Sequence, residues 1–313
     1  MDQLPQVSII IPTFNRENFV QDTLNSVKAQ TFEDWECIIV DDGSTDGSAL
    51  LIHSLIEKDQ RFQYYKRPEI YPKGASSCRN YGFNLSNGKY IQWLDDDDLL
   101  STNKLELQWL ELENQKNSKI FSTCGWDLIW QGKQFQLKNF MKDQVSIDPK
   151  DFYQEISKQQ AFVPLHAYLT PRELIRAAGE WNSRLSVNDD AEFFTRILLN
   201  ADKLINTKGC HVLYREHEVG RISRKSDETA LNSLMLSFRL IHSYLTAFGV
   251  EGKPYFKWKL LKAFYKYHDT YPAILREHKD FFLENGINLN WRIYYLIKHR
   301  IYGFLYPLYK NYL

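Results

Sequence analysis

The chain has 313 residues, of which 43% are hydrophobic and 15% aromatic, so it can bury a sizeable core in one large domain with an appendage or in two domains. Lys plus Arg and Asp plus Glu number 39 each, and because this balance leaves no positive excess, we expect no nucleic-acid partner. The four cysteines (Cys37, Cys78, Cys124 and Cys210) form no Cys-x-x-Cys pair, which argues against a zinc knot and favours free thiols in a reducing compartment.

The sequence shows no export or membrane-spanning signal. No basic segment with a cleavage site precedes the first strand-like run. No stretch of about 18 uncharged apolar residues occurs either, so we expect no transmembrane helix. We therefore expect a cytoplasmic protein that is soluble or attached peripherally to the inner face of the membrane.

Strand-like and helix-like patterns alternate through the N-terminal third of the chain. Short β-branched or apolar runs predict buried strands at residues 7–11, 35–40, 62–66 and 90–94. Amphipathic spacing predicts helices between them at residues 18–30, 48–58 and 76–85. Strands that alternate with helices indicate a mostly parallel, Rossmann-like sheet that is flanked by helices. The predicted fold class is therefore α/β.

The rest of the chain is less regular. We expect a helix at 104–118, strands within 120–130, a polar loop with a short helix at 133–160, a strand at 162–169, helices at 171–178 and 191–200, and a short last strand at 211–215. A long helical pattern follows at 227–248, and residues 253–313 carry eleven Lys and Arg against four Asp and Glu. We therefore divide the chain into an α/β domain, residues 1–222, and a helical C-terminal region, residues 223–313.

Polar clusters follow three of the predicted strands at the point where each strand ends. Residues 13–16 follow the first strand, Asp41–Ser44 follows the second, and Asp95–Asp98 follows the fourth. In open parallel sheets, ligands bind beyond the carboxyl ends of the strands. Placement of all three clusters at such ends predicts one shared site.

The four aspartates Asp95–Asp98 point to a divalent cation. Adjacent carboxylates repel one another and their pKa values rise unless a cation neutralises them. Mg²⁺ typically binds one or two carboxylates together with substrate phosphates. On an extended segment Asp95 and Asp97 would share one face, with Asp96 and Asp98 opposite. The alternative is a solvated acidic turn that caps the following helix.

Taken together, these segments resemble the inverting, nucleotide-sugar-dependent glycosyltransferases of family 2, which have the fold called GT-A. The matching segments are residues 7–16, 39–46, 74–82 and 88–98, in the order and spacing of the family. The resemblance extends over about residues 5–220. It implies transfer of a sugar from a nucleotide-sugar, expected to be a UDP-sugar, to an acceptor hydroxyl in bacterial-type cell-surface polysaccharide or glycoconjugate synthesis.

The resemblance also implies roles for individual residues. It places the nucleotide-sugar against Pro12, Thr13, Phe14, Asn15, Arg16, Asp42, Arg79, Asp95, Asp96 and Arg215. Within this set Phe14 would stack near the base, Asp42 would bind the base, and Arg79 would lie near the ribose or diphosphate, while Asp41 supports the turn. Mn²⁺ or Mg²⁺ would be held by Asp97, Asp98 and His217.

The acceptor side of the resemblance rests on two short segments. Asp190 matches the family's general base, the Asp of a Glu-Asp pair that opens a helix, and Asp189 replaces the usual Glu. The alternative for Asp189 and Asp190 is an acidic first turn that the helix dipole favours. Trp181, in Gly179-Glu-Trp181, resembles an acceptor-side element and could stack on a sugar face.

Two other functions and one further partner stay open. A sugar nucleotidyltransferase would also need acids and Mg²⁺, but it would carry a glycine-rich, lysine-ended phosphate loop that residues 12–16 do not match. A non-catalytic nucleotide-sugar- or glycan-binding module would bind the nucleotide-sugar without turnover. Residues 291–310 mix aromatic and basic side chains and predict peripheral attachment to anionic lipid, which would suit a lipid-linked acceptor, the expected acceptor being a glycan or a lipid-linked one. A helical subdomain or a dimer contact is the alternative for this segment.

Overall fold

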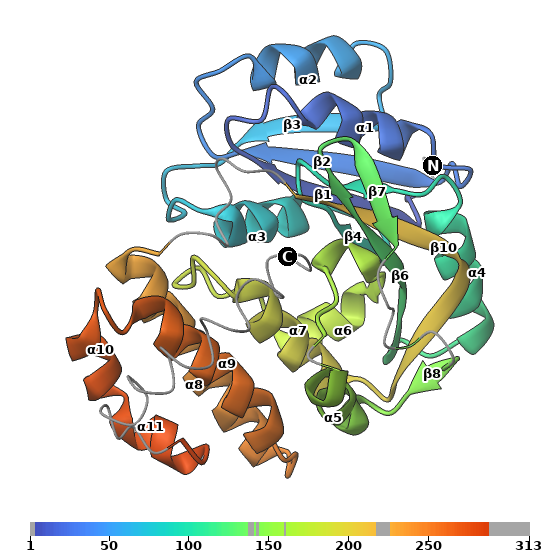
Figure 1. Ribbon diagram of the computed structural model, residues 1–313. Coiled ribbons are helices and arrows are strands. Elements are labelled where there is room, and N and C mark those ends of the chain that lie inside the picture. The colour runs from blue at the N-terminus through green and yellow to red at the C-terminus, as the bar shows by residue number, and fades with distance from the viewer. Residues whose placement is uncertain (1–3, 137–140, 142–143, 160, 217–225, 288–313) are drawn as a thin grey trace. The chain divides into compact units, whose positions relative to one another are not determined.

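The computed structural model describes residues 4–136, 141, 144–159, 161–216 and 226–287 (Figure 1). Contacts divide the chain into two compact units, residues 1–252 and 253–313. The first unit includes α8 (Glu228–Ala247), although its composition groups it with the helical C-terminal region, because α8 packs on α7 (Asp189–Asn200).

The first of two five-stranded sheets holds the four strands predicted in the N-terminal third of the chain. Its order is β3-β2-β1-β4-β9, with β1 at Val7–Thr13, β2 at Trp35–Asp41, β3 at Phe62–Lys66, β4 at Tyr90–Trp93 and β9 at Thr170–Pro171. The first four strands are parallel, and β9 runs antiparallel beside β4. The alternation of strands and helices predicted from sequence is confirmed over this region.

Helices cover both faces of this sheet. α1 (Val20–Lys28) and α2 (Ser48–Ile56) lie on one face, and α3 (Ala75–Leu85) lies on the other (Figure 1). Because side chains alternate along a strand, Ile39 joins the main core while its neighbours in β2 pack with Cys78 of α3. Gly82 permits this contact, since a Cβ there would lie 2.6 Å from Ile10 Cγ2.

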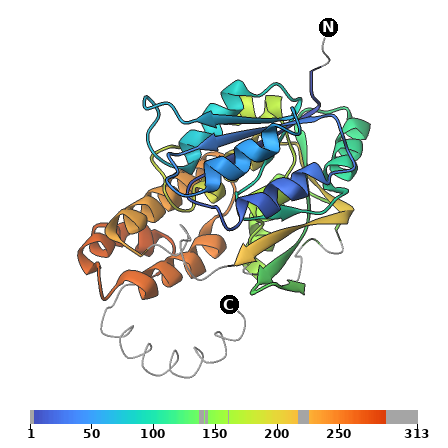
Figure 2. The same ribbon diagram turned by 90° about the horizontal axis from the view of Figure 1, so that it is seen from above.

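The second five-stranded sheet has the order β5-β10-β6-β7, with β8 paired to β10. The strands are β5 (Leu99–Leu100), β6 (Ile120–Trp130), β7 (Lys133–Gln136), β8 (Ser146–Ile147) and β10 (Lys203–Glu216). The two long strands β6 and β10 are parallel neighbours, and β6 continues into β7 as a hairpin (Figure 2). The remaining elements of this unit are α4 (Lys104–Gln115), α5 (Pro149–Gln159), the short 3-10 helix η1 (Leu165–Ala167) and α6 (Arg172–Ala178).

The region of the second sheet differs from the sequence prediction in three places. The last strand begins at Lys203 rather than at residue 211, and the segment 133–160, expected as a loop with a short helix, contains that helix as α5 but also the strands β7 and β8. The expected strand at 162–169 is irregular chain around η1. β7 and β8 have only four and two residues, most of them polar, so their sequences do not distinguish them from loops.

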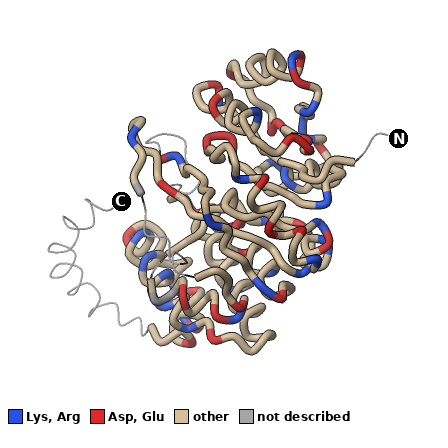
Figure 3. The backbone as a smooth tube through the Cα atoms, turned by 90° about the vertical axis from the view of Figure 1, so that its right-hand side faces the viewer, with Lys and Arg blue, Asp and Glu red and all other residues tan. Residues whose placement is uncertain are grey.

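The second unit is helical in its described part. It contains α9 (Lys253–Tyr267), α10 (Pro272–Glu277) and α11 (Lys279–Glu284), and buried aromatic side chains such as Phe256, Phe264 and Phe281 form its core. Residues 291–310, on which the membrane prediction rests, lie outside the described residues. Within the described chain, no helix is both long enough and apolar enough to cross a membrane. Positive and negative residues are interspersed along the chain (Figure 3).

Candidate active site

The strand order creates a switch point at the carboxyl ends of β1 and β4, where two of the predicted clusters meet. From β1 the chain runs outward through β2 and β3, and it then returns to β4 on the other side of β1. Ligands bind at such a switch point, beyond the carboxyl ends of the diverging strands. Phe14 N, after β1, donates to Asp96 Oδ2, after β4, at 3.2 Å. Arg16 Nε lies 3.3 Å from Asp96 Oδ1 and 3.6 Å from Asp97 Oδ2.

The segment after β1 is fixed by the loop after β2. Pro12 and Thr13 are buried at the end of β1. Asn15, at φ 52°, receives a 2.8 Å hydrogen bond from Thr45 N, and Arg16 N donates to Ser48 Oγ at 2.8 Å. Phe14 stays 39% exposed, with Lys73 Nζ 4.2 Å from its ring centre. The ring is therefore available to stack on a planar base.

The two aspartates after β2 have different surroundings. Asp41 is 2% exposed and accepts hydrogen bonds from Gly43 N at 2.9 Å, from Ser44 N at 2.7 Å and from Tyr64 Oη at 2.6 Å. These contacts give Asp41 a role in the turn. Asp42 forms an ion pair with Arg67 Nε, which holds its carboxylate in one orientation after the end of β2.

Arg79 joins the aspartate run to the start of α7. Its guanidinium is nearly buried and donates to Asp95 Oδ1 at 2.7 Å and to Asp189 Oδ2 at 3.0 Å. Ser76 Oγ also donates to Asp189 Oδ2, at 2.9 Å. Burial alone would lower the pKa of Arg79, but Asp95 and Asp189 outweigh it and raise the pKa. One fixed cation therefore holds two segments that are distant in sequence.

Asp190 is the neighbour of this anchored residue. It lies in the first turn of α7, after Asn188, which adopts a left-handed conformation with φ 57°. Its Oδ1 accepts a hydrogen bond from Ala191 N at 2.7 Å. The helix dipole favours a carboxylate at this end. Because Asp189 is tied to Arg79, the position of Asp190 relative to the aspartate run is defined.

Asp98 is enclosed by protein. It is 1% exposed, its Oδ1 accepts from Arg215 N at 2.7 Å, and its Oδ2 lies 3.1 Å from His166 Nδ1. Burial lowers the pKa of His166 to about 3, so the ring is neutral at pH 7. Arg215 Nε donates to Asp97 O at 2.8 Å, and its Nη2 donates to Asp22 Oδ2 at 3.1 Å. His166 sits in an apolar stretch, so the sequence offered no signal for it.

The acidic residues of the run fit a divalent cation that is bound mainly through a substrate. Burial and the neighbouring Asp97 raise the pKa of Asp96 to about 8, a charge conflict that a cation would relieve. Among the described residues, no group of three or more His, Cys, Asp and Glu side chains could hold a metal alone. Mg²⁺ commonly uses one or two carboxylates plus phosphate oxygens. Asp96 and Asp97 can supply the carboxylates, and a substrate diphosphate can supply the phosphate oxygens. His217 lies outside the described residues.

Trp181 lies beside this arrangement but is buried. The side chain is 3% exposed, and its ring stacks on Phe193 with 4.0 Å between centres and 7° between planes. The guanidinium carbon of Arg79 lies 4.4 Å from the same ring. The contact between Trp181 and an acceptor sugar stays a prediction. In the described conformation the indole instead supports Arg79.

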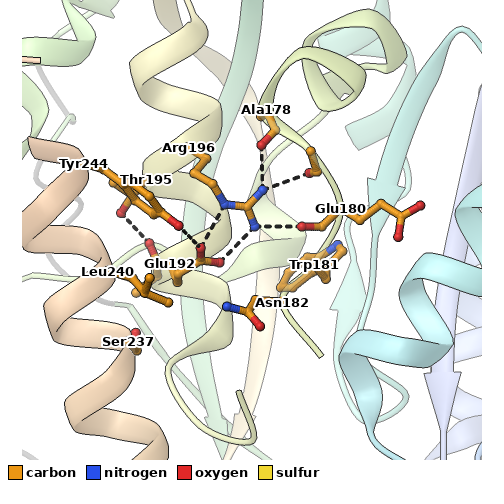
Figure 4. Close-up of polar contacts among 12 residues, drawn as sticks. Ala178, Glu180, Trp181, Asn182, Glu192, Thr195, Arg196, Ser237, Leu240 and Tyr244 are labelled. Atoms are coloured by element: carbon orange, nitrogen blue, oxygen red, sulfur yellow. Dashed lines mark hydrogen bonds and ion pairs between the residues drawn. The ribbon is translucent and has the colours of Figure 1, made fainter. Parts of the chain in front are cut away.

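A buried ion pair holds the loop that carries Trp181 (Figure 4). Arg196 of α7 donates to the carbonyl oxygens of Ala178 at 2.7 Å, Gly179 at 3.0 Å and Glu180 at 2.8 Å. Glu192, 1% exposed, pairs with Arg196 at 2.9 Å and accepts from Tyr244 Oη at 3.1 Å. The sequence alone gives no sign of these contacts, because an i, i+4 pair on a helix is common on protein surfaces.

Known proteins resemble this chain in sequence and in fold. The Glycosyl transferase family 2 model matches residues 8–155. An uncharacterized glycosyltransferase from Rickettsia typhi is 31% identical over 240 residues, which cover 74% of this chain and 68% of the relative. A Campylobacter jejuni GalNAc(5)-diNAcBac-PP-undecaprenol beta-1,3-glucosyltransferase is 31% identical over 153 residues, 48% of each chain. The crystal structure of residues 1–349 of S. aureus TarS with UDP-GlcNAc superimposes with a TM-score of 0.65 at 17% identity, over 85% of this chain and 74% of that TarS fragment.

These findings define a glycosyltransferase with the GT-A fold, so the predicted fold class and enzyme class are confirmed. The chain belongs to glycosyl transferase family 2. It spans 17% and 20% of the length of two further Rickettsia relatives, which are 43% and 39% identical over 124 residues.

Proposed function

We propose that this enzyme transfers a sugar from a UDP-sugar to a hydroxyl group of a glycan or lipid-linked acceptor, with inversion and with the help of Mn²⁺ or Mg²⁺. The observation that carries the proposal is the position of Arg79 between Asp95 and Asp189. It brings the acidic end of β4 next to the helix turn that presents Asp190. A TarS structure that contains UDP-GlcNAc supports the choice of nucleotide.

The nucleotide would bind at the switch point between β1 and β4. Phe14 is exposed to stack on the base, and Asp42 is oriented by Arg67 to accept a base N–H. Asp95, whose carboxylate Arg79 holds, faces the sugar side of the nucleotide. Asp96 and Asp97 would hold the divalent cation, which, when bound, neutralises charge on the departing diphosphate. Arg215 adds a second positive charge at this edge.

The chemical step would be a single displacement. Asp190 accepts the proton of the acceptor hydroxyl while its oxygen forms a bond to the anomeric carbon. The bond from that carbon to the diphosphate oxygen breaks on the opposite face, and UDP leaves with the electron pair. The configuration at the anomeric carbon inverts, and no covalent enzyme intermediate forms. Asp189 would position Asp190 through its contacts with Arg79 and Ser76.

The biological setting would be cell-surface polysaccharide or glycoconjugate synthesis at the inner face of the membrane. The name of the C. jejuni relative includes undecaprenol, which supports a lipid-linked acceptor. The basic residues of α9, among them Lys257 and Lys262, supply charge for peripheral attachment to anionic lipid.

A panel of nucleotide-sugars tests the donor site. UDP-, GDP- and dTDP-sugars would be added with Mn²⁺ or with chelator, and thermal shift and slow hydrolysis would be measured. We expect a shift with UDP-sugars that depends on the metal and is lost in Asp97→Ala. If no nucleotide-sugar shifts the protein, the proposed donor site is wrong. A shift with GDP- or dTDP-sugars alone would overturn the choice of UDP.

A further inference from the structure

One face of the second sheet carries aromatic side chains that the proposed chemistry does not use. Alternate residues of a strand share a face, and residues paired across a ladder project to the same side. In the parallel register Val212 pairs with Trp126, Tyr214 with Leu128 and Glu216 with Trp130, and in the hairpin Leu128 pairs with Phe135. We call this set the aromatic face: Trp126, Leu128, Trp130, Phe135, Tyr214 and the covering ring of Phe162.

The aromatic face begins in the core and ends in solvent. Trp126 is 8% exposed, and its ring lies 4.5 Å from that of Phe162 and 6.1 Å from that of Tyr214. Further along, the exposed fractions are 40% for Trp130, 42% for Phe135 and 43% for Phe162. Large apolar side chains that gather on a surface next to a site commonly mark a place where a ligand binds.

The buried end of this face adjoins the aspartate run. Tyr214 directly precedes Arg215, whose amide donates to Asp98 Oδ1 at 2.7 Å. The His166 ring lies parallel to that of Tyr214, at 6.1 Å and 14°, and its Nδ1 is 3.1 Å from Asp98 Oδ2. The aspartate run therefore lies between the aromatic face and the Arg79 bridge to α7. A molecule lying on the aromatic face would lead toward the place where transfer is proposed.

The polar residues of this face indicate what kind of molecule fits. By register, Glu216 and Lys133 flank Trp130 on the same side, one acid and one base. An anionic bilayer favours a cluster of basic residues, which this pair is not. A sugar presents a C–H face that packs on an aromatic ring and hydroxyl groups that bond to carboxylates and amines. The mixture of rings with single charges of both signs suits a neutral carbohydrate.

We propose that the aromatic face is an acceptor-binding subsite that takes neutral sugar residues of a glycan, stacked on Trp130 and Phe135, with the reactive end directed past Tyr214. This inference rests on the proposed glycosyl transfer and names the chemistry of its acceptor. It requires an acceptor of several sugars, because the exposed rings lie beyond the strand positions that contact Asp98.

The proposal can be tested by measuring how the full chain binds to an array of neutral oligosaccharides. The array would include gluco-, galacto- and N-acetylhexosamine oligomers. We expect wild-type protein to bind at least one oligomer series, and Trp130→Ala and Phe135→Ala each to weaken that binding by about tenfold, the share of roughly one sugar–aromatic stack. Phe248→Ala is the matched control, since Phe248 is 50% exposed at the end of α8, outside this face. It should bind like wild type.

Donor binding separates failure of this inference from failure of the proposed function. The UDP-sugar thermal shift should stay unchanged in Trp130→Ala and Phe135→Ala, because both residues belong to the second sheet and neither is assigned to the proposed donor site. If the shift persists but no oligosaccharide binds, or if all three variants bind glycan equally, the acceptor subsite is wrong and the donor site stands. A change in sedimentation or in vesicle binding that is confined to the two variants would assign the face to a second copy or to lipid, and would also overturn the proposal.

Discussion

Asp189 and Asp190 are adjacent acids with different surroundings, and substitution should separate their roles. Asp190→Asn should keep the stability and the donor-induced thermal shift but lower transfer by about 10²–10⁴-fold, the usual contribution of a general base. Asp189→Asn should instead lower the free energy of unfolding by about 2 kcal/mol, since it removes the charge that Arg79 faces. Urea unfolding and transfer assays on both variants check this. Full transfer in Asp190→Asn would refute its assignment as the base.

Lys104 is a buried amine that makes stability depend on pH. It is 0% exposed and contacts Gln92 Oε1 and Tyr168 O, and burial lowers its pKa from 10.5 to about 8. Because the folded pKa lies below the unfolded one, the buried charge costs about 3 kcal/mol below pH 8, and this cost is relieved as the pH rises from 8 to 10.5.

A comparison with Lys104→Met isolates this effect. Wild type should gain stability relative to Lys104→Met as the pH rises through that window, and groups that titrate alike in both proteins cancel in the difference. Urea unfolding at pH 8 and pH 10 measures it. Lys28→Met, at an exposed position, should show no such trend. A difference between wild type and Lys104→Met that does not change with pH would contradict the prediction.

The site residues differ in how far the sequence alone could find them. Short motifs at strand ends identified Phe14, Asp42 and the aspartate run, because topology alone brings such ends together. The sequence could not show that Asp98 is enclosed by His166 and the Arg215 amide, or that Arg79 also binds Asp189. These contacts depend on packing between distant segments, and single residues in apolar or helical stretches give no pattern to read.

At the scale of elements, the ion pair of Arg196 and Glu192 joins α7 to the end of α6, and we call this pair the clamp. Its contribution to stability can be tested by substitution. Arg196→Met would leave Glu192 buried without its cation and three carbonyl oxygens without their shared hydrogen-bond donor. Loss of one partner of a buried pair costs about 3–5 kcal/mol. The double variant Arg196→Met with Glu192→Leu should recover part of the loss, because no buried charge remains.

A second pair provides the control for this clamp. Arg176 and Glu173 on α6 form an i, i+3 pair whose side chains are 60% and 63% exposed. Arg176→Met should therefore change the free energy of unfolding by at most about 0.5 kcal/mol. Chemical denaturation would measure the free energy of unfolding of wild type, Arg196→Met, the double variant and Arg176→Met. Equal losses for Arg196→Met and Arg176→Met would mean that the clamp contributes no more than a surface pair.

The elements that the sequence predicted best are those with a strong period. β1, β2 and β4 are buried along their whole length, and α1 buries one apolar stripe, so apolar runs and apolar spacing mark them. β7 and β8 are short edge strands, and the first half of β10 is stabilised by pairing with β6 and β8 rather than by apolar alternation alone. Their structure comes from neighbours far away in sequence, which local patterns do not record.

At the scale of the whole molecule, the basic second unit contains none of the residues to which we assign the chemistry. α9 has five lysines and no acid, and its rings and ammonium groups are in contact, with Lys262 Nζ 4.9 Å from the Trp258 ring. Burial and repulsion by Lys259 lower the pKa of Lys262. A nearby anion would therefore stabilise the positively charged side chains of this helix. Anionic lipid headgroups meet that need, and each lysine near the surface contributes about 1 kcal/mol.

Vesicle co-sedimentation tests this attachment. The full chain should bind vesicles that contain anionic lipid, and a chain ending at Gly252, where the first unit ends, should not. Replacing Lys257, Lys262 and Lys266 with Gln should weaken binding by about a hundredfold. The same change at Lys28, Lys58 and Lys116, exposed lysines of the first unit, should have little effect because those residues lie on separate elements. Equal losses for the two triple variants would show that only net charge matters and that α9 has no special role.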